Sequence, residues 1–488
     1  MKNIIDRIKI KRTSFLLFLL FLFLYLPFIF YGNFSRDDWF LIDLHQQKHF
    51  FLALQEAFIP FSNRPFAAIF FLITSRISDS FYFYLILDLA IYFAAILIIF
   101  RSLEEFLENN FIKITFLISL MIPIYSMTNF FSPGMQILGH VSLFLWSLML
   151  VSQKYYFDTN QSKYLFLFFL ITAVMLLTYE SAFPLISLNI FYPLLRKKNK
   201  KLLSTCLIIL FAVLVSFIAQ KIILPNFSGS GDISRFRLSD ESAFFIIRLI
   251  LINIALQVNI FFIYFSNILL ALEDLFSNHY MTIFSTIILF VLISIIMIFS
   301  KKKITFFKTY NKIYKPNIIF IILLFILCIF LIALMHTVAK SGVSFWGYNN
   351  RALLALSVVM SIIVSFIYGF YKKKKIISGL IVFFLIIKVI YLYSFQLNHI
   401  MYSKKILEIT TKVTTFLKGD KNISELSNEK DGLVIVYSKN FLNLKLYEKI
   451  TYVNDNFDFR YLIENMNDKY FYSNSKIVIP KQKIYLEE

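Results

Sequence analysis

The sequence predicts an all-α polytopic membrane protein that ends in a small α/β domain. Hydrophobic residues make up 59% of its 488 residues and charged residues 16%, against about 25% in a typical soluble domain. Apolar runs of about 20 residues, the length of a helix that crosses a bilayer, recur along the chain. Basic residues gather in short segments between these runs. These three observations exclude a soluble globular protein and a disordered chain.

About eleven apolar runs are candidate membrane spans, and the first is a retained span because no small-residue cleavage site follows it. The candidates are Phe15–Tyr31, Phe81–Phe100, Ile112–Phe130, Met135–Ser152, Tyr164–Thr178, Ala182–Leu195, Leu202–Ile223, Met281–Phe299, Asn317–His336, Ala352–Phe370 and Ile376–Phe395. The short runs on either side of Glu180 are interpreted as two spans. A single span over residues 164–195 fits the same topology if Arg64–Ile77 also crosses, so the count varies by about two.

Two apolar segments are not counted as single spans. Arg64–Ile77 is short for a span, so we expect a helix that lies on the outer membrane surface. Phe244–Leu272 is longer but carries Arg248, Asn253 and Gln257. Because polar side chains inside a membrane are costly, this segment is interpreted as re-entrant, interfacial or a pair of short spans.

The distribution of the net charge of +20 predicts the orientation of the spans. Lysines and arginines cluster in Lys2–Arg12, Arg196–Lys201, Lys301–Lys315 and Lys372–Lys375. By the positive-inside rule, these segments and the N-terminus lie in the cytoplasm. A nucleic-acid-binding protein would instead carry one folded basic surface. We therefore predict a multi-pass protein of the cytoplasmic (inner) membrane that does not bind nucleic acid.

The chain divides into a transmembrane domain, residues 1–397, and a C-terminal tail, residues 398–488. The tail is charged and contains a predicted helix at Ile406–Leu417 and predicted strands at Leu433–Tyr437 and Lys476–Ile479. It is predicted to form a small extracytoplasmic α/β domain. Within the transmembrane domain, residues 32–80 form the first outer loop.

The first outer loop carries Arg36, Asp37, Asp38 and Trp39 directly after the first span. Two adjacent carboxylates beside a membrane are costly unless they are used or compensated. One can serve as a general base while the other orients it or binds a cation. The alternative is a helix N-cap, because aspartate before an amphipathic run commonly begins a helix.

Arg64 and Glu180 are further candidates for a functional site. Arg64 leads into an apolar helix and can bind a lipid phosphate through two hydrogen bonds, or simply extend to lipid headgroups. Glu180, next to Tyr179, lies between two apolar runs and far in sequence from other charges. A carboxylate in that position needs a partner or a catalytic task. Its structural alternative is an ion pair with an arginine such as Arg64.

Two weaker candidate sites lie in later spans. His140 lies inside Met135–Ser152, where a lone histidine is more often a hydrogen-bonded structural residue than a ligand, and no second ligand stands at zinc spacing. Trp346, Tyr348 and Arg351 can hold a sugar ring and its phosphate, or form an interfacial aromatic belt. The sequence has no phosphate-binding glycine loop, dinucleotide fingerprint, GxSxG or HExxH motif.

Over residues 1–200 the chain resembles GT-C fold glycosyltransferases, and more closely the bacterial serotype-converting O-antigen glucosyltransferases. The resemblance rests on Arg36-Asp37-Asp38 at the start of the loop, Asn63-Arg64-Pro65-Phe66 further along it, and Tyr179-Glu180 in mid-chain. It implies a cell-envelope enzyme that moves a sugar, with inversion, from a polyprenyl-phosphate donor. The implied acceptor, on the outer face, is a glycan such as lipopolysaccharide O-antigen, a lipid or a protein.

The resemblance also implies residue roles. Asp37 or Asp38 would be the catalytic base, and the other would orient it or bind a divalent cation, Mg²⁺ or Mn²⁺, whose participation stays open. Glu180, the third catalytic candidate, would bind substrate hydroxyls or stabilise an arginine. The candidates for binding the donor phosphate are Arg64, Arg351 and Arg36. The candidates for substrate contacts are Trp39, Tyr179, His140, Trp346 and Tyr348.

Two other functional classes stay open. An O-antigen-type polymerase or ligase also acts on lipid-linked glycans, and Arg235, Arg237 and Arg351 suit it, although the acidic pair favours a transferase. A transporter or flippase for lipid-linked sugars would have charged residues and broken helices near the bilayer midplane, in two matching halves. The sequence shows neither feature clearly.

Overall fold

The structure is a computed structural model, and its described part covers most of the predicted transmembrane domain. The described residues are 15–31, 41, 44–45, 49–58, 64–78, 80–123, 137–220, 242–301, 317–338, 353–369, 374–419, 434–436 and 483–485. Within them the regular structure is helical apart from two strands, β1 (Val434–Val436) and β2 (Lys483–Tyr485), which pair in parallel. Seven of the described helices are long and apolar enough to cross a membrane. The described part of the chain is therefore predominantly helical, with helices suited to a membrane, as the composition predicts.

The helices follow the apolar runs of the sequence. A helix at Phe15–Leu24 continues after Tyr25 as α2 (Leu26–Tyr31). The first half then contains α4 (Phe50–Phe58), α5 (Pro65–Ile77), α6 (Phe81–Leu103), η2 (Glu104–Phe106), α7 (Asn110–Met121), α8 (Ile137–Thr159), α9 (Ser162–Thr178), η4 (Glu180–Leu185), α10 (Ile186–Leu195), η5 (Asn199–Lys201) and α11 (Leu202–Ile218). The second half contains α13 (Ala243–Ser266), α14 (Ile268–Ser277), α15 (His279–Lys301), α16 (Ile318–Val338), α17 (Leu354–Ile367) and α18 (Lys374–Gly419).

Local sequence signals explain several helix ends. Pro65 opens α5, where its missing N–H would have had no intrahelical partner. Asn109 caps α7, because its side chain accepts a hydrogen bond from the Ile112 N–H at 3.0 Å. Between α8 and α9, Asn160 takes a φ of 58°, a left-handed conformation that asparagine tolerates.

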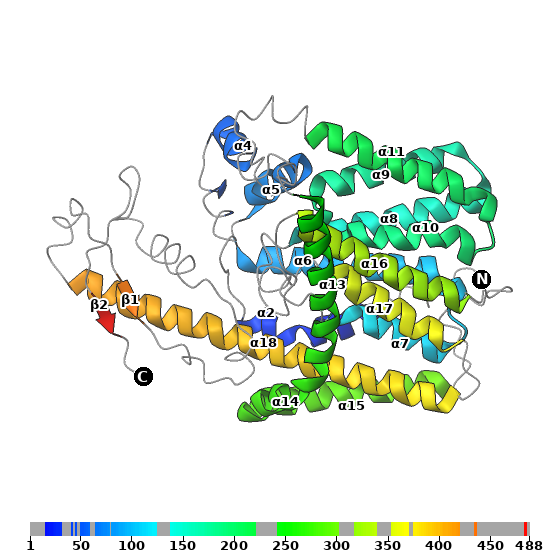
Figure 1. Cartoon of the computed structure of the whole chain (residues 1–488). Helices are drawn as coiled ribbons and strands as arrows, with labels where there is room; N and C mark the ends of the chain where they lie inside the picture. Colours follow the sequence, from blue (N-terminus) through cyan, green and yellow to red (C-terminus); the bar gives the residue numbers. More distant parts are fainter. Residues whose placement is uncertain are drawn as a thin grey trace, which may run out of the picture.

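The helices form a bundle with apolar side chains on its outside. In Figure 1, α6 to α11 and α15 to α18 run roughly side by side, whereas α13 lies across them at a steep angle. The large side chains of Trp146 and Tyr192 are fully buried, while Leu207, Phe290 and Ile326 are among the exposed apolar ones. Such an outer surface suits contact with lipid tails, which are as apolar as leucine.

The predicted break near Glu180 is confirmed, because α9 ends at Thr178 and residues 164–195 do not form one helix. The structure divides Phe244–Leu272 between α13 and α14. α13 is long enough to span a membrane, and in Figure 1 it crosses the other helices at a steep angle. The helix α4 in the first outer loop was not predicted.

The end of the transmembrane domain differs from the prediction. The last predicted span and the predicted helix Ile406–Leu417 are one continuous helix, α18, which extends beyond the other helices in Figure 1. No glycine or proline separates the two segments, so the boundary predicted at 397–398 falls inside the helix. β1 lies within the predicted strand Leu433–Tyr437, whereas β2 was not predicted. The remainder of the predicted α/β domain, including Lys476–Ile479, lies outside the described residues.

Candidate functional site

Two of the predicted site residues, Arg64 and Tyr179, meet in the structure. The Cζ atom of the Arg64 guanidinium lies 4.7 Å from the centroid of the Tyr179 ring. A guanidinium at this distance from a ring face is attracted by the negative face of the aromatic system. Arg64 stands directly before α5 and Tyr179 directly after α9, so the contact joins the predicted first outer loop to the middle of the chain.

Tyr179 lies at a break between two helices, α9 and η4, and its backbone is not helical. Tyr179 is extended, with φ of −166° and ψ of 128°, between α9 and η4. A continuous α-helix is blocked here, because Pro184 lacks an N–H and its ring would clash with the Glu180 carbonyl. The Tyr179 N–H donates to the Met175 carbonyl at 3.1 Å, and the Ser142 hydroxyl donates to the Tyr179 carbonyl at 2.5 Å. Both backbone polar groups at the break are therefore satisfied.

Side chains on one face of α8 donate hydrogen bonds to residues at and after this break. Besides Ser142, the Trp146 indole N–H donates to the Leu185 carbonyl at 3.2 Å and to the Asn189 side chain at 2.7 Å. Further along the same face, the Gln153 amide donates to the Asn189 carbonyl at 2.8 Å. These three α8 residues lie four and seven positions apart, so they share one helix face. They hold η4 and α10 against α8 through side-chain hydrogen bonds.

Glu180 follows Tyr179 as the first residue of η4, but its side chain lies outside the described part of the structure. The other predicted site residues also lie outside the described residues, so their contacts are not placed. They are Arg36, Asp37, Asp38, Trp39, Trp346, Tyr348 and Arg351. Among the residues that the structure does describe, no group of three or more His, Cys, Asp or Glu could hold a metal ion.

His140 is placed away from the Arg64–Tyr179 contact. Its Nδ1 atom lies 2.6 Å from an Asp88 oxygen on α6, and both side chains are completely buried. The Tyr92 ring lies beside the imidazole, with centroids 4.4 Å apart. Side chains two positions apart on a helix point in directions that differ by about 200°. His140 therefore faces α6, while Ser142 faces Tyr179. The structural interpretation of His140 is thus the one that its geometry favours.

Asp88 is a residue that the sequence analysis missed. It lies inside the predicted span Phe81–Phe100, and a carboxylate within an apolar run is a functional or structural signal by itself. Its Oδ2 atom is buried and has no hydrogen-bond partner among the described residues. The same signal, a charge inside the predicted span Ile376–Phe395, would have identified Lys388.

Lys388 belongs to a second polar centre, at the C-terminal end of α7. α7 has 12 residues, about 18 Å of helix, so it ends within the bundle. Three neighbouring carbonyls at this end each accept a side-chain hydrogen bond. Lys388 donates to Ser119 at 2.5 Å, Tyr92 to Leu120 at 2.6 Å and Tyr25 to Met121 at 2.8 Å. These bonds satisfy carbonyl groups that have no partner within the helix at its end.

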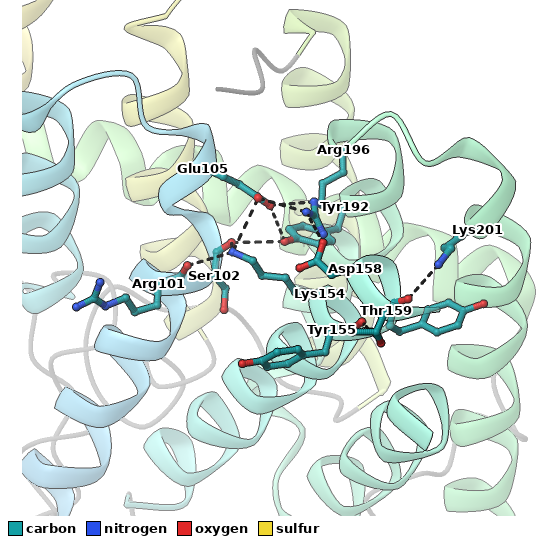
Figure 2. Close-up of polar contacts among 11 residues, drawn as sticks. Arg101, Ser102, Glu105, Lys154, Tyr155, Asp158, Thr159, Tyr192, Arg196 and Lys201 are labelled. Carbon is teal, nitrogen blue, oxygen red and sulfur yellow. Dashed lines mark hydrogen bonds and ion pairs between the residues drawn. The ribbon is translucent and has the colours of Figure 1, made fainter. Parts of the chain in front are cut away.

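At the opposite end of the bundle, a buried ion network joins η2, α8 and α10 (Figure 2). Glu105 accepts a hydrogen bond from the Tyr192 hydroxyl at 3.0 Å and pairs with Arg196 Nε at 3.0 Å and Lys154 Nζ at 3.9 Å. Arg196 Nη2 also lies 2.7 Å from an Asp158 oxygen. Burial alone would lower the pKa of Arg196, but Tyr192, Glu105 and Asp158 raise it above its ordinary value.

The segment between α6 and α7 makes ion pairs with residues of two basic clusters that are predicted to be cytoplasmic. Through Glu105 it binds Arg196, from the cluster Arg196–Lys201. Through Glu108 it binds Lys374, from the cluster Lys372–Lys375. Arg196 and Lys374, far apart in sequence, therefore lie at the same end of the bundle.

No protein-family model, curated protein or solved structure matches the chain.

Proposed function

We propose that this chain is a GT-C-type membrane glycosyltransferase that moves a sugar from a polyprenyl-phosphate donor to an acceptor on the outer face. The observation that carries the proposal is the contact between Arg64 and Tyr179. It brings together two of the three motifs on which the resemblance rests, although they come from different helices. The third motif, with Asp37 and Asp38, belongs to the same first outer loop as Arg64.

The location of the contact suits a lipid-linked donor. The half-buried Arg64 begins the apolar helix α5, whose Ile69 and Ile73 side chains are exposed. A polyprenyl chain can pack on apolar side chains, while the guanidinium binds the phosphate through two hydrogen bonds. Tyr179 supports the guanidinium from one side through its ring face. In the proposed site, the Arg64 guanidinium beside this apolar helix is the donor-binding element.

The proposed chemistry needs one base and one phosphate-binding group. The acceptor hydroxyl oxygen attacks the anomeric carbon, and its proton passes to the carboxylate of Asp37 or Asp38. The bond between the anomeric carbon and the phosphate oxygen breaks on the opposite face, which inverts the configuration. The lipid phosphate leaves as an anion, stabilised by Arg64. A divalent cation at Asp37 and Asp38 would add charge stabilisation.

The proposed orientation puts this site outside the cytoplasm. The end of the bundle that holds Arg196 and Lys374 is the cytoplasmic end by the positive-inside rule. α9 begins beside that end and runs away from it, so Tyr179 faces the other side of the membrane. An eleven-span topology with a cytoplasmic N-terminus agrees with this arrangement.

The experiment that tests the proposal is sugar transfer from a panel of radiolabelled polyprenyl-phosphate sugars in vesicles. We expect Asp37→Asn or Asp38→Asn to abolish transfer. Arg64→Ala removes a charge-assisted hydrogen bond, so the KM for the donor should rise about tenfold or more. Arg76→Ala, in the last turn of the same helix, is the matched control and should leave the KM unchanged. Transfer that survives both aspartate substitutions would contradict the proposed base.

A transporter of lipid-linked sugars is the second candidate, and one observation favours it. α7 ends within the bundle, next to the completely buried Lys388 and near the buried Asp88. Charged residues beside an interrupted helix are features of transporter binding sites. The same vesicles separate the two classes. A transporter moves the labelled lipid across the membrane without transferring the sugar, whereas a transferase releases the label from the lipid.

A further inference from the structure

In the basic segment Arg196–Lys201, the first and last residues contact the bundle, whereas the lysines between them are exposed to solvent. Its two ends point into the bundle: Arg196 pairs with Glu105 and Asp158, and Lys201 Nζ donates to the Tyr156 carbonyl at 3.0 Å. Figure 2 shows Arg196 directed into the ion network. The middle lysines, by contrast, are exposed. They are Lys197, Lys198 and Lys200.

The turn that carries these lysines has a defined backbone. The Lys198 N–H donates to the Pro193 carbonyl at 2.7 Å, and the Lys201 N–H donates to the Lys198 carbonyl at 2.8 Å. Lys197 takes a φ of 57°, which reverses the chain between α10 and η5. The three exposed ammonium groups are therefore presented by a closed turn with both ends anchored. A preorganised site of this kind loses less conformational entropy on binding.

Four acidic side chains that the structure describes at this end of the bundle are paired with other residues. Glu104 pairs with Lys113 at 3.0 Å, Glu105 and Asp158 pair with Arg196, and Glu108 pairs with Lys374. The exposed lysines of the turn make no side-chain hydrogen bond or ion pair with any residue that the structure describes. Three positive charges thus remain for an external anion.

The helix after the turn, α11, has an exposed apolar face, which indicates what kind of anion the lysines bind. Exposed apolar side chains follow one face of α11 from its first turn, at spacings of three and four residues. They are Leu203, Leu207, Leu210, Phe211, Leu214 and Phe217. Such a face suits acyl chains, and Tyr155 stacks on Tyr164 near the same end, as aromatic residues do at a membrane interface. A free phosphate would not require the apolar face, whereas a phospholipid requires both parts.

We propose that the turn at Lys197–Lys200 and the exposed face of α11 form a binding site for an anionic phospholipid. The headgroup phosphate binds the lysines, and the acyl chains lie along Leu203, Leu207 and Leu210. This site is remote from Arg64 and Tyr179, since it lies at the other end of the bundle. It is independent of the proposed transferase reaction and is tested without it.

The test is native mass spectrometry of the full chain in detergent, titrated with phosphatidylglycerol or with phosphatidylcholine of the same acyl chains. We expect the wild type to bind phosphatidylglycerol more tightly than phosphatidylcholine, and less tightly as the salt concentration rises. The triple variant Lys197→Gln, Lys198→Gln, Lys200→Gln should lose about tenfold to hundredfold in affinity for phosphatidylglycerol. The triple arginine variant keeps the charges and should retain binding.

A charge-matched control substitutes three lysines of α18, Lys404, Lys405 and Lys412, by glutamine and should retain the wild-type affinity. The proposal is overturned if the wild type binds both lipids equally, or if the two glutamine variants lose affinity to the same extent. It is also overturned if millimolar inorganic phosphate displaces phosphatidylglycerol, because the site would then bind phosphate alone.

Discussion

Asp88 and His140 form a hydrogen-bonded pair 2.6 Å apart between α6 and α8, and neither side chain has any exposed surface. Removal of one member of a buried pair leaves the other without its partner, which costs about 3–5 kcal/mol. We expect Asp88→Leu or His140→Leu alone to lower the thermal unfolding temperature in detergent strongly. The double substitution should recover much of the loss, because two apolar side chains can replace a buried pair.

Ile86→Ala is the matched control for this series, since Ile86 lies on the same helix but is 60% exposed. It should shift the unfolding temperature little. If the double variant is as unstable as the sum of the two single variants, Asp88 and His140 act independently and the pair contributes no coupling.

Lys388 is expected to stabilise the C-terminal end of α7. Lys388→Met removes the hydrogen bonds to the Ser119 carbonyl and hydroxyl, which the lysine makes at 2.5 and 3.1 Å. The Ser119 carbonyl then keeps the longer hydrogen bond from the Ile122 N–H at 3.4 Å, but the loss of the shorter bond should lower the free energy of unfolding by about 1–3 kcal/mol. Lys375→Met, at the exposed start of α18, is the control and should have no comparable effect. Equal stability of the two variants would show that the α7 end does not depend on Lys388.

Ser142 is expected to act as a positioning residue for Tyr179, if the proposed transferase function holds. Ser142→Ala removes the hydroxyl that donates to the Tyr179 carbonyl. The ring beneath Arg64 should then shift, which raises the KM for the lipid-linked donor more than it lowers kcat. Ser142→Thr restores a hydroxyl and should restore the KM.

The control for Ser142 is Ser147→Ala, a buried serine of the same helix whose hydroxyl donates to the Phe144 carbonyl within α8. A purely structural effect would lower the stability of both alanine variants and leave the KM of each unchanged. That outcome would remove Ser142 from the proposed site.

The proposed orientation predicts from which side of the membrane an impermeant reagent can reach each end of the bundle. In a chain whose Cys206 and Cys328 are replaced by alanine, a cysteine at Lys200 should react with an impermeant maleimide only after permeabilisation. A cysteine at the exposed Arg76 should react from outside in intact cells. If both positions were labelled from the same side, the proposed topology, with residue 76 outside and residue 200 inside, would be wrong.

The sequence by itself determined the class of the protein and many of its helix boundaries. Length and hydropathy predict helices because a backbone in lipid must satisfy its polar groups internally. Pro65 predicts the start of α5, and the interruption at Tyr179-Glu180 is visible as a polar break between apolar runs. The basic segments predict a common cytoplasmic side for Arg196 and Lys374, and both residues pair with acidic side chains between α6 and α7, Glu105 and Glu108.

Only the tertiary structure decided which side chains meet. Hydropathy gives the length of a helix and the side-chain spacing along it, but it does not say which face packs on which neighbour. For this reason Arg64 could be predicted as a phosphate ligand, whereas its stacking on Tyr179 could not. For His140 the sequence left a structural role and a substrate contact open, and the rotation of α8 directs its side chain to Asp88. The end of α7 beside Lys388 likewise depends on packing between helices distant in sequence.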